Sequence, residues 1–191
     1  AQFYGYDSRE HLKFASQAYS GYVLARVNRA PLGTLRALYD NERAKSLTGL
    51  PLVHLGIALS LQGDKKRGGK AIADGFAKTG DRPRYLGDYG SRVRDDALMI
   101  ALVHERKAGK PEYDARSVSL GRELDARRNT GWLYLSTQEQ VALARLGKAL
   151  LVDQKKLVSG SYSVGGETEV IAPTRIFSRA FDYATLAKGV R

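Results

Sequence analysis

The chain has 191 residues, of which 43% are hydrophobic and 27% charged, and its formal net charge is +11. This length and composition are typical of a folded chain with a substantial core, and they exclude a low-complexity or disordered protein. Because the sequence contains no cysteine, it also excludes a disulfide, a thiolate nucleophile and a Cys-ligated metal.

The first helix is expected after Asp7-Ser8, which are good N-cap residues, and it should end near Asn28. Helical spacing predicts a buried stripe made of Leu12, Ala15, Tyr19, Val23 and Val27. A second, shorter helix should bury one stripe made of Leu32, Leu35, Leu38 and Tyr39.

Two kinds of helix then alternate along the chain. Residues 50–64, residues 95–109 and the segment from Ser136 are apolar on several faces, whereas residues 70–78 and the segment from Tyr113 are apolar on one stripe. The apolar helices are centred near Leu55, Leu98 and Leu143, which lie 43 and 45 residues apart. We therefore predict a mainly α fold, an array of helical hairpins over residues 1–156 that forms either a closed α/α toroid or an open superhelix.

Residues 157–191 differ from this array and are expected to contain short strands. Val158, Gly160, Tyr162 and Val164 alternate on one face, and Gly165-Gly166 stands at a turn position. One hairpin alone is marginally stable. This segment should therefore join or begin a neighbouring β domain.

The 31 Lys and Arg residues are spread along the chain. The two densest groups are Lys65, Lys66, Arg67 and Lys70, and then Arg82, Arg84, Arg92 and Arg94. Neither group has interleaved aromatic residues that could stack on bases. The sequence thus predicts solvated basic faces and no nucleic-acid partner.

Four segments, taken together, resemble the bacterial alpha-2-macroglobulins. They are YVLARVNRAPLGTLRALYDN from Tyr22, GLPLVHLGIALSLQGDKKRG from Gly49, GDYGSRVRDDALMIALVHE from Gly87 and YLSTQEQVALARLGKAL from Tyr134. The resemblance implies that residues 1–156 are the C-terminal part of the thioester-type α/α ring domain, next to β-sandwich domains. It also implies that the chain is an internal fragment of a large periplasmic protein, often anchored to the inner membrane by a lipid outside this fragment.

The mechanism implied by the resemblance is protease trapping. A target protease cuts a bait region, and the molecule then rearranges and entraps it. In many members a thioester between Cys and Gln of a C-L-E-Q motif adds a covalent link. This motif would have to lie upstream of Ala1, because the chain has no cysteine, and some bacterial relatives lack it.

The residues that could carry chemistry have simpler explanations. Asp95 and Asp96, after Arg94, stand at a helix start, where carboxylates interact with exposed N–H groups, and adjacent helical residues do not face one site. Ser136 and Glu139 form a capping box, with no G-x-S-x-G elbow around the serine.

The remaining candidates are also weak. His11, His54 and His104 are too scattered for a metal site, and His54 is expected to be a core histidine. Residues 65–70 are expected to form a basic loop between helices, without phosphate-loop spacing. Aromatic contact points against hairpins or a neighbouring domain are expected at Phe3, Tyr4, Tyr6, Trp132 and Tyr134.

We therefore expect no catalytic, cofactor-binding or metal-binding residue, and no cofactor. The expected function is a ring-domain scaffold in a periplasmic broad-specificity protease inhibitor, with target proteases and neighbouring β-sandwich domains as partners. The alternatives are a helical-repeat peptide-binding module or an α/α-toroid enzyme. The enzyme would show convergent acids at the ends of the inner helices, facing a common pocket.

Overall fold

The computed structural model of the chain describes residues 8–78, 82–83, 86–131, 134–153, 158–174 and 179–189. It divides into two compact units, residues 1–150 and 151–191. The boundary expected between residues 156 and 157 lies outside the described residues. None of the described helices combines the length and the apolarity needed to cross a membrane.

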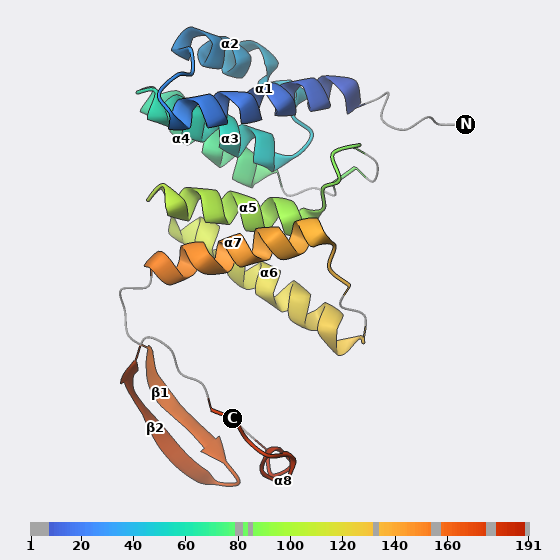
Figure 1. Ribbon diagram of the computed structural model, residues 1–191, viewed down its shortest axis with the longest axis vertical. Coiled ribbons are helices and arrows are strands. Elements are labelled where there is room, and N and C mark those ends of the chain that lie inside the picture. The colour runs from blue at the N-terminus through green and yellow to red at the C-terminus, as the bar shows by residue number, and fades with distance from the viewer. Residues whose placement is uncertain are drawn as a thin grey trace, which may run out of the picture. The chain divides into compact units, whose positions relative to one another are not determined.

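The order of the elements confirms a mainly α fold followed by two strands (Figure 1). The helices are α1 (Arg9–Arg26), α2 (Leu32–Glu42), η2 (Arg43–Lys45), α3 (Gly49–Leu61), α4 (Lys65–Ala77), α5 (Arg92–Glu105), α6 (Pro111–Asn129), α7 (Thr137–Asp153) and α8 (Tyr183–Leu186). The strands are β1 (Val158–Val164) and β2 (Glu167–Thr174).

Helix α3 forms the centre of the core. Every residue from Gly49 to Leu59 is buried, because α1, α2, α4 and α5 all contact this helix. In Figure 1 helices α1 and α2 lie on one side of α3, and α5 lies on the other. Helix α5 is the second helix buried on several faces, as its apolar run predicts.

Helices α3 and α4 touch through their backbones at paired glycines. A Cβ atom added to Gly56 would lie 2.7 Å from the Gly68 carbonyl oxygen, and one added to Gly68 would lie 2.6 Å from the Gly56 oxygen. About two helical turns earlier in α3, Gly49 faces the backbone of Gly75 in the same way. Close packing of these helices therefore requires the absence of side chains at these positions.

The outer helices bury single stripes. In α2 the buried residues are Leu35, Leu38 and Tyr39, which confirms the predicted stripe apart from the half-buried Leu32. In α6 the buried residues include Tyr113, whose ring stacks on Phe76 of α4 with 3.9 Å between the ring centroids. This stacking joins two successive hairpins.

The predicted stripe of α1 is wrong. Tyr19, Val23 and Val27 are 54%, 44% and 63% exposed. The buried face consists instead of His11, Phe14, Ala18, Gly21, Tyr22 and Ala25. Small residues let α1 approach its neighbours, since a Cβ atom on Gly21 would lie 2.6 Å from Leu35 Cδ2.

Two further expectations are corrected. Residues 65–70 form the first turns of α4 rather than a loop, because the Asp64 side chain caps the helix by accepting from Arg67 N. Helix α7 is buried on one stripe only, and Val141 is 63% exposed. Among the described residues α7 is the last helix of the first unit.

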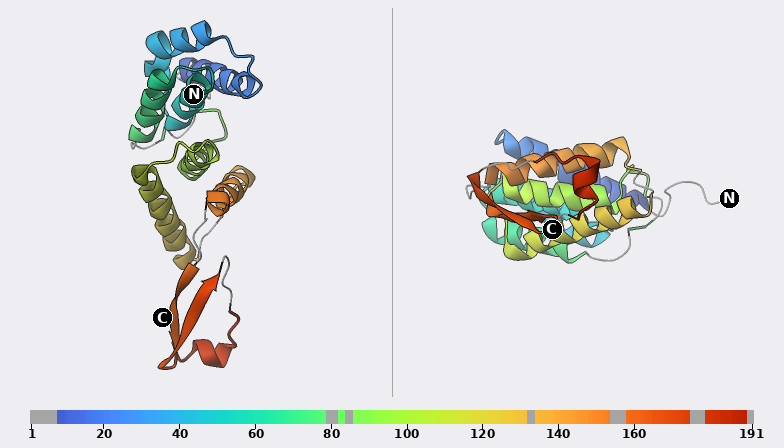
Figure 2. Two further views of the ribbon diagram at one scale, coloured as in Figure 1. Left: turned by 90° about the vertical axis from the view of Figure 1, so that its left-hand side faces the viewer. Right: turned by 90° about the horizontal axis from the view of Figure 1, so that it is seen from below.

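The second unit contains the predicted hairpin. Strands β1 and β2 pair antiparallel, with Ser161 opposite Val170 and Val164 opposite Glu167. The turn between them is made by Gly165 and Gly166, whose φ values of 58° and 93° favour glycine. The two strands lie side by side in both views of Figure 2.

Candidate functional site at the N-terminal ends of α5 and α7

Serine residues cap the two helices. Ser91 Oγ accepts a hydrogen bond from Arg94 N at 3.1 Å, and Ser136 Oγ accepts one from Glu139 N at 3.3 Å. In return, Glu139 Oε2 accepts from the Ser136 backbone N–H at 2.8 Å and from its hydroxyl at 2.9 Å. This confirms the capping box that the sequence predicts at α7.

Glu139 also connects the two helices. The Ser91 hydroxyl donates to Glu139 Oε1 over 2.7 Å, so one carboxylate receives donors from both helix starts. Burial raises the pKa of Glu139, but hydrogen bonds from Ser91 and Ser136 outweigh it and leave the pKa below its ordinary value. The GDYGS and YLSTQE segments therefore meet at a charged carboxylate that is only 7% exposed.

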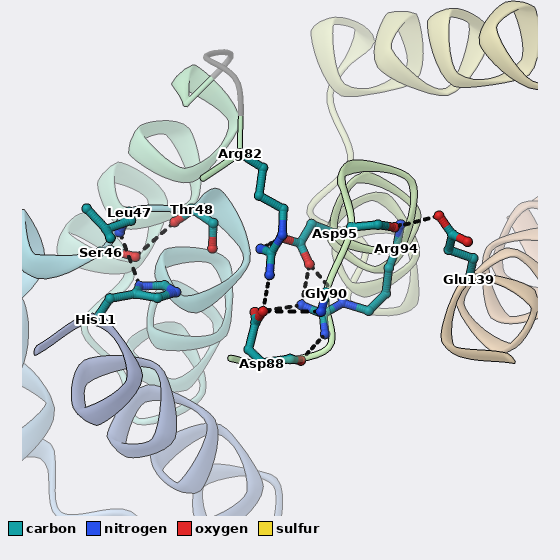
Figure 3. Close-up of polar contacts among 11 residues, drawn as sticks. His11, Ser46, Leu47, Thr48, Arg82, Asp88, Gly90, Arg94, Asp95 and Glu139 are labelled. Atoms are coloured by element: carbon teal, nitrogen blue, oxygen red, sulfur yellow. Dashed lines mark hydrogen bonds and ion pairs between the residues drawn. The ribbon is translucent and has the colours of Figure 1, made fainter. Parts of the chain in front are cut away.

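A second cluster fastens the loop before α5 to that helix. Figure 3 shows Arg82 and Arg94 reaching Asp88 from two sides. Asp95 accepts from Arg82 Nη1 at 2.8 Å and from Arg94 Nη2 at 2.6 Å. The four side chains are 7% to 21% exposed, so this is a largely buried network of two cations and two anions.

The same network holds a tight turn. Asp88 Oδ1 accepts from Gly90 N at 3.1 Å, and Arg94 Nη1 donates to the Asp88 carbonyl oxygen at 2.8 Å. Between them Tyr89 has a φ of 51° and a 92% exposed side chain. Burial raises the pKa of Asp88, but the hydrogen bond and charge of Arg82 outweigh it, so the pKa is lowered.

These contacts correct two expectations. Ser91, rather than Asp95 or Asp96, caps α5, and both aspartates are bound to arginines; Asp96 Oδ1 lies 3.1 Å from Arg116 Nε. The basic group after residue 80 is not a solvated face at Arg82 and Arg94, whose side chains are 11% and 12% exposed. A salt-bridge network gives them buried partners.

The arrangement is better suited to holding the loop before α5 and the start of α7 against α5 than to catalysis. Asp88 and Asp95 share Arg82 and Arg94, and Glu139 joins the starts of α5 and α7, so each carboxylate already accepts from arginine, serine or backbone donors. The lowered pKa values of Asp88 and Glu139 keep both groups ionised and unable to act as general acids near neutral pH. Asp96 has a pKa raised by burial, yet it forms an ion pair with Arg116.

The three histidines lie apart. His11 Nδ1 accepts from Leu47 N at 3.2 Å, while the buried Nε2 has no partner among the described residues. His54 is buried against Tyr19 and Tyr22, with ring centroids 5.2 and 5.1 Å away, which confirms it as a core histidine. His104 Nε2 lies 2.7 Å from Asp114 Oδ1. Within the described ranges no His, Asp and Glu side chains gather as a possible metal site.

Some candidates lie elsewhere. Tyr134, two residues before the Ser136 cap, is 77% exposed, whereas Phe3, Tyr4, Tyr6 and Trp132 lie outside the described residues. The pairing of Arg82 with both Asp88 and Asp95 was not predicted. The only sign of this pairing in the sequence is that Arg82 and Asp88 stand in the loop before a helix whose first turns contain Asp95 and Asp96.

Three comparisons place the chain among known proteins, although no family model matches it. An alpha-2-macroglobulin of Xylella fastidiosa (strain 9a5c) is 67% identical over 190 residues, which are 99% of this chain and 12% of the relative. The crystal structure of a Salmonella alpha-2-macroglobulin mutant covers 98% of this chain and 12% of its own, with a TM-score of 0.77 and 34% identity.

The third comparison is with Escherichia coli alpha-2-macroglobulin activated by porcine elastase. It covers 89% of this chain and 15% of its own, with a TM-score of 0.68 and 35% identity. The chain thus spans 12% of the length of the Xylella relative. Sequence and fold agree over nearly the whole of this chain, and it therefore belongs to the bacterial alpha-2-macroglobulin family.

Proposed function

We propose that this chain is a helical-ring scaffold segment of a periplasmic, broad-specificity protease trap. The observation that carries the proposal is the 67% identity to the Xylella alpha-2-macroglobulin across 99% of the chain. The E. coli relative activated by elastase supports proteases as the partners of the full-length protein. Neighbouring β-sandwich domains of the same polypeptide are the other partners.

The described contacts suit a scaffold. Helices α3 and α4 are locked by backbone contact at glycine pairs, and α5 and α7 are tied by Glu139 at their first turns. A ring that moves as one body during trapping needs connections of this kind between successive hairpins. The acids at the helix starts serve these connections, which argues against the α/α-toroid enzyme.

Location and covalent chemistry belong to the same proposal. The full-length protein is periplasmic and held to the inner membrane by a lipid attached outside residues 1–191. Any C-L-E-Q thioester also lies outside them, because these residues include no cysteine. The role of this segment is then to support the shape of the domain that carries or shields the reactive bond.

A chimaera tests the proposal. The matching segment of the Xylella alpha-2-macroglobulin is replaced by this chain, and the purified chimaera is incubated with porcine elastase. Trapping should block cleavage of a large substrate such as casein while hydrolysis of a small chromogenic peptide continues. A chimaera carrying Gly56→Leu, which forces α3 from α4, should lose this effect.

Two outcomes would contradict the scaffold function. A folded chimaera that leaves casein cleavage unaffected, while the parent protein blocks it, would show that this chain cannot replace the ring segment. Peptide binding by that chain alone would then favour the helical-repeat module. Loss of small-peptide hydrolysis together with casein cleavage would indicate active-site inhibition instead of trapping.

A further inference from the structure

The turns after α1, α3 and α5 lie at one end of the first unit. In the turn after α3, Gln62 Nε2 donates to the carbonyl oxygen of Ala25, near the end of α1, at 3.5 Å. At the end of α5, the pKa of Glu105 is lowered chiefly by its hydrogen bond to Arg145, and nearby charges, including that of Arg26 at the end of α1, lower it further. Figure 1 agrees with these contacts, since α1 and α5 both begin on the right and end on the left. The three turns therefore form one edge.

This edge carries an excess of exposed cations. The acids at the three turns already have basic partners: Asp64 pairs with Arg36 and Arg67, Glu105 with Arg145, and Glu112 with Lys110. Five exposed basic residues, by contrast, form no ion pair with any described residue. They make up the basic edge: Arg26, Arg29, Lys65, Lys66 and Lys107. The charge of the basic edge is therefore available to an anion from outside the described part of the chain.

The two lysines of α4 are placed against the dipole of their own helix. The first turn of α4 contains Lys65, Lys66 and Arg67 and no acid, whereas α5 and α6 both have acids in their first turns. A cation at a helix N-terminus is unfavourable because the helix dipole is positive there. Asp40 and Asp64 offset this cost for Arg67, but no described residue offsets it for Lys65 or Lys66. A local arrangement that costs stability and gains no partner within the fold is typical of a functional surface, and here it indicates an anionic partner.

Exposed apolar side chains stand beside these cations. Val27, 63% exposed, follows Arg26 in the turn after α1, and Leu61, 39% exposed, is the last residue of α3. A dissolved anion gains nothing from such side chains, whereas an anionic bilayer offers phosphates to the cations and acyl chains to the apolar residues. Three of the five cations are lysines, which are depleted at protein–protein interfaces and whose flexible stems suit a layer of phosphates. A lipid surface therefore fits the basic edge better than an acidic protein does.

We propose that the basic edge binds the surface of an anionic phospholipid bilayer. The five cations lie against the lipid phosphates, and Val27 and Leu61 enter the headgroup region between them. The helices stay outside the hydrocarbon core, because no described helix is long and apolar enough to cross it. This interaction goes beyond the scaffold function and does not depend on it.

Vesicle sedimentation with the full 191-residue chain tests this surface. The chain is mixed with vesicles made of phosphatidylglycerol and phosphatidylcholine in equal parts, or of phosphatidylcholine alone. We expect the chain to sediment with the anionic vesicles, to stay in solution with the neutral ones, and to be released as the salt concentration rises. Failure to bind the anionic vesicles would overturn the proposal, and binding to polyglutamate instead would indicate an acidic protein as the partner.

Matched double variants decide whether the basic edge itself makes the contact. Lys65→Gln combined with Lys66→Gln should weaken binding about twenty-fivefold, at about fivefold for each charge removed. Lys13→Gln combined with Lys78→Gln removes two exposed lysines near the start of α1 and after α4, at the other end of the helices. Because α1 has 18 residues and is about 27 Å long, this end lies beyond the Debye length of about 10 Å, and binding should change little. Equal losses in the two double variants would show that only the net charge matters and would overturn the proposal.

Two matched leucines test which end of the first unit touches the bilayer. The chain has no cysteine, so Leu61→Cys and Leu47→Cys variants can each carry a single environment-sensitive fluorophore. Leu61 is 39% exposed at the basic edge, and Leu47 is 44% exposed at the other end, where its N–H donates to His11 near the start of α1. Anionic vesicles should shift the emission to shorter wavelength at position 61 and leave it unchanged at position 47. The proposal is overturned if position 61 shows no shift or if position 47 shifts as much.

Discussion

Glu139 shows how one side chain can determine the relation between two helices. It accepts from the backbone and hydroxyl of its own cap, Ser136, and from the hydroxyl of Ser91, the cap of α5. Its carboxylate is buried, so each donor replaces a water that the ion would otherwise bind. The contact between the helices therefore depends on a charged group remaining paired.

A double-mutant cycle should detect this dependence. Glu139→Ala alone should lower the free energy of unfolding by about 1–3 kcal/mol, because it removes a cap partner and leaves buried donors unpaired. Ser91→Ala should cost less in that background than in the original chain, with a coupling energy of about 0.5–3 kcal/mol. Urea unfolding measures all four forms, and simple additivity of the two changes would contradict the direct contact.

Burial of His54 predicts a pH dependence. Desolvation lowers its pKa from 6.5 to about 3, and burial lowers the pKa of His11 in the same direction. Between these pH values the unfolded chain binds more protons than the folded chain, so stability is complete above pH 6.5 and falls on acidification. For His54 the loss should approach about 1.4 kcal/mol per pH unit below pH 6.5.

The interval from pH 6.5 to 5 isolates this effect, because carboxylates titrate mainly below it. Urea unfolding at several pH values should give a shallower slope for His54→Leu than for the original chain. As a control, Lys65→Gln changes an exposed residue and should keep the original slope. An unchanged slope in His54→Leu would show that His54 does not remain neutral in the fold.

At this scale the sequence predicts local contacts and misses distant ones. The Ser136 and Glu139 box was predictable because cap partners lie three residues apart. Arg82 and Asp95 are 13 residues apart across a loop of Gly, Pro and Asp, and nothing in hydrophobic periodicity specifies how such a loop turns. The buried network was therefore assigned to a solvated face.

Among the elements, the helix starts follow the predicted repeat. The cap positions Thr48, Ser91 and Ser136 are 43 and 45 residues apart, the same spacing as the predicted centres of the apolar helices. Helix α1 was misassigned because its packing face is built from small residues, and Ala18 and Gly21 contribute little to a hydrophobic pattern. Tyr19 and Val23 dominate the pattern, yet they are exposed.

Glycine pairs between α3 and α4 give the sharpest prediction for an element. Gly56→Ala should destabilise the chain by about 1–3 kcal/mol, since the new methyl group would lie 2.7 Å from the Gly68 carbonyl oxygen and the Ile72 side chain. Gly69 lies in α4, and a Cβ atom added there meets nothing within 4 Å, so Gly69→Ala should stabilise the helix by up to about 1 kcal/mol. Thermal or urea unfolding of both variants checks the opposite signs, and equal effects would exclude backbone contact as the cause.

For the whole molecule, the fold class could be predicted because two levels of pattern agree. Apolar helices such as α3 and α5 require cover on most sides, and the one-sided helices α2, α4 and α6 supply it. The strand tail was predictable from its alternation and its Gly165-Gly166 turn. The exposed side of α7 was not, because the pattern of a helix does not show whether a neighbour follows it.

The two units should differ in local stability. The hairpin has only two strands and exposes residues such as Val170, at 78%, whereas α3 is buried from Gly49 to Leu59. A two-stranded sheet gains little from burial and opens at low cost, while exchange in a central helix requires global unfolding. In hydrogen–deuterium exchange, amides of β1 and β2 should exchange roughly a thousandfold or more faster than those of α3.

A chain ending at Asp153 should show the same protection in α3, because that helix takes its cover from α1, α2, α4 and α5. If the hairpin amides were as protected as those of α3, or if removing the hairpin exposed α3 to exchange, the second unit would have to stabilise the first, and the two units would unfold as one.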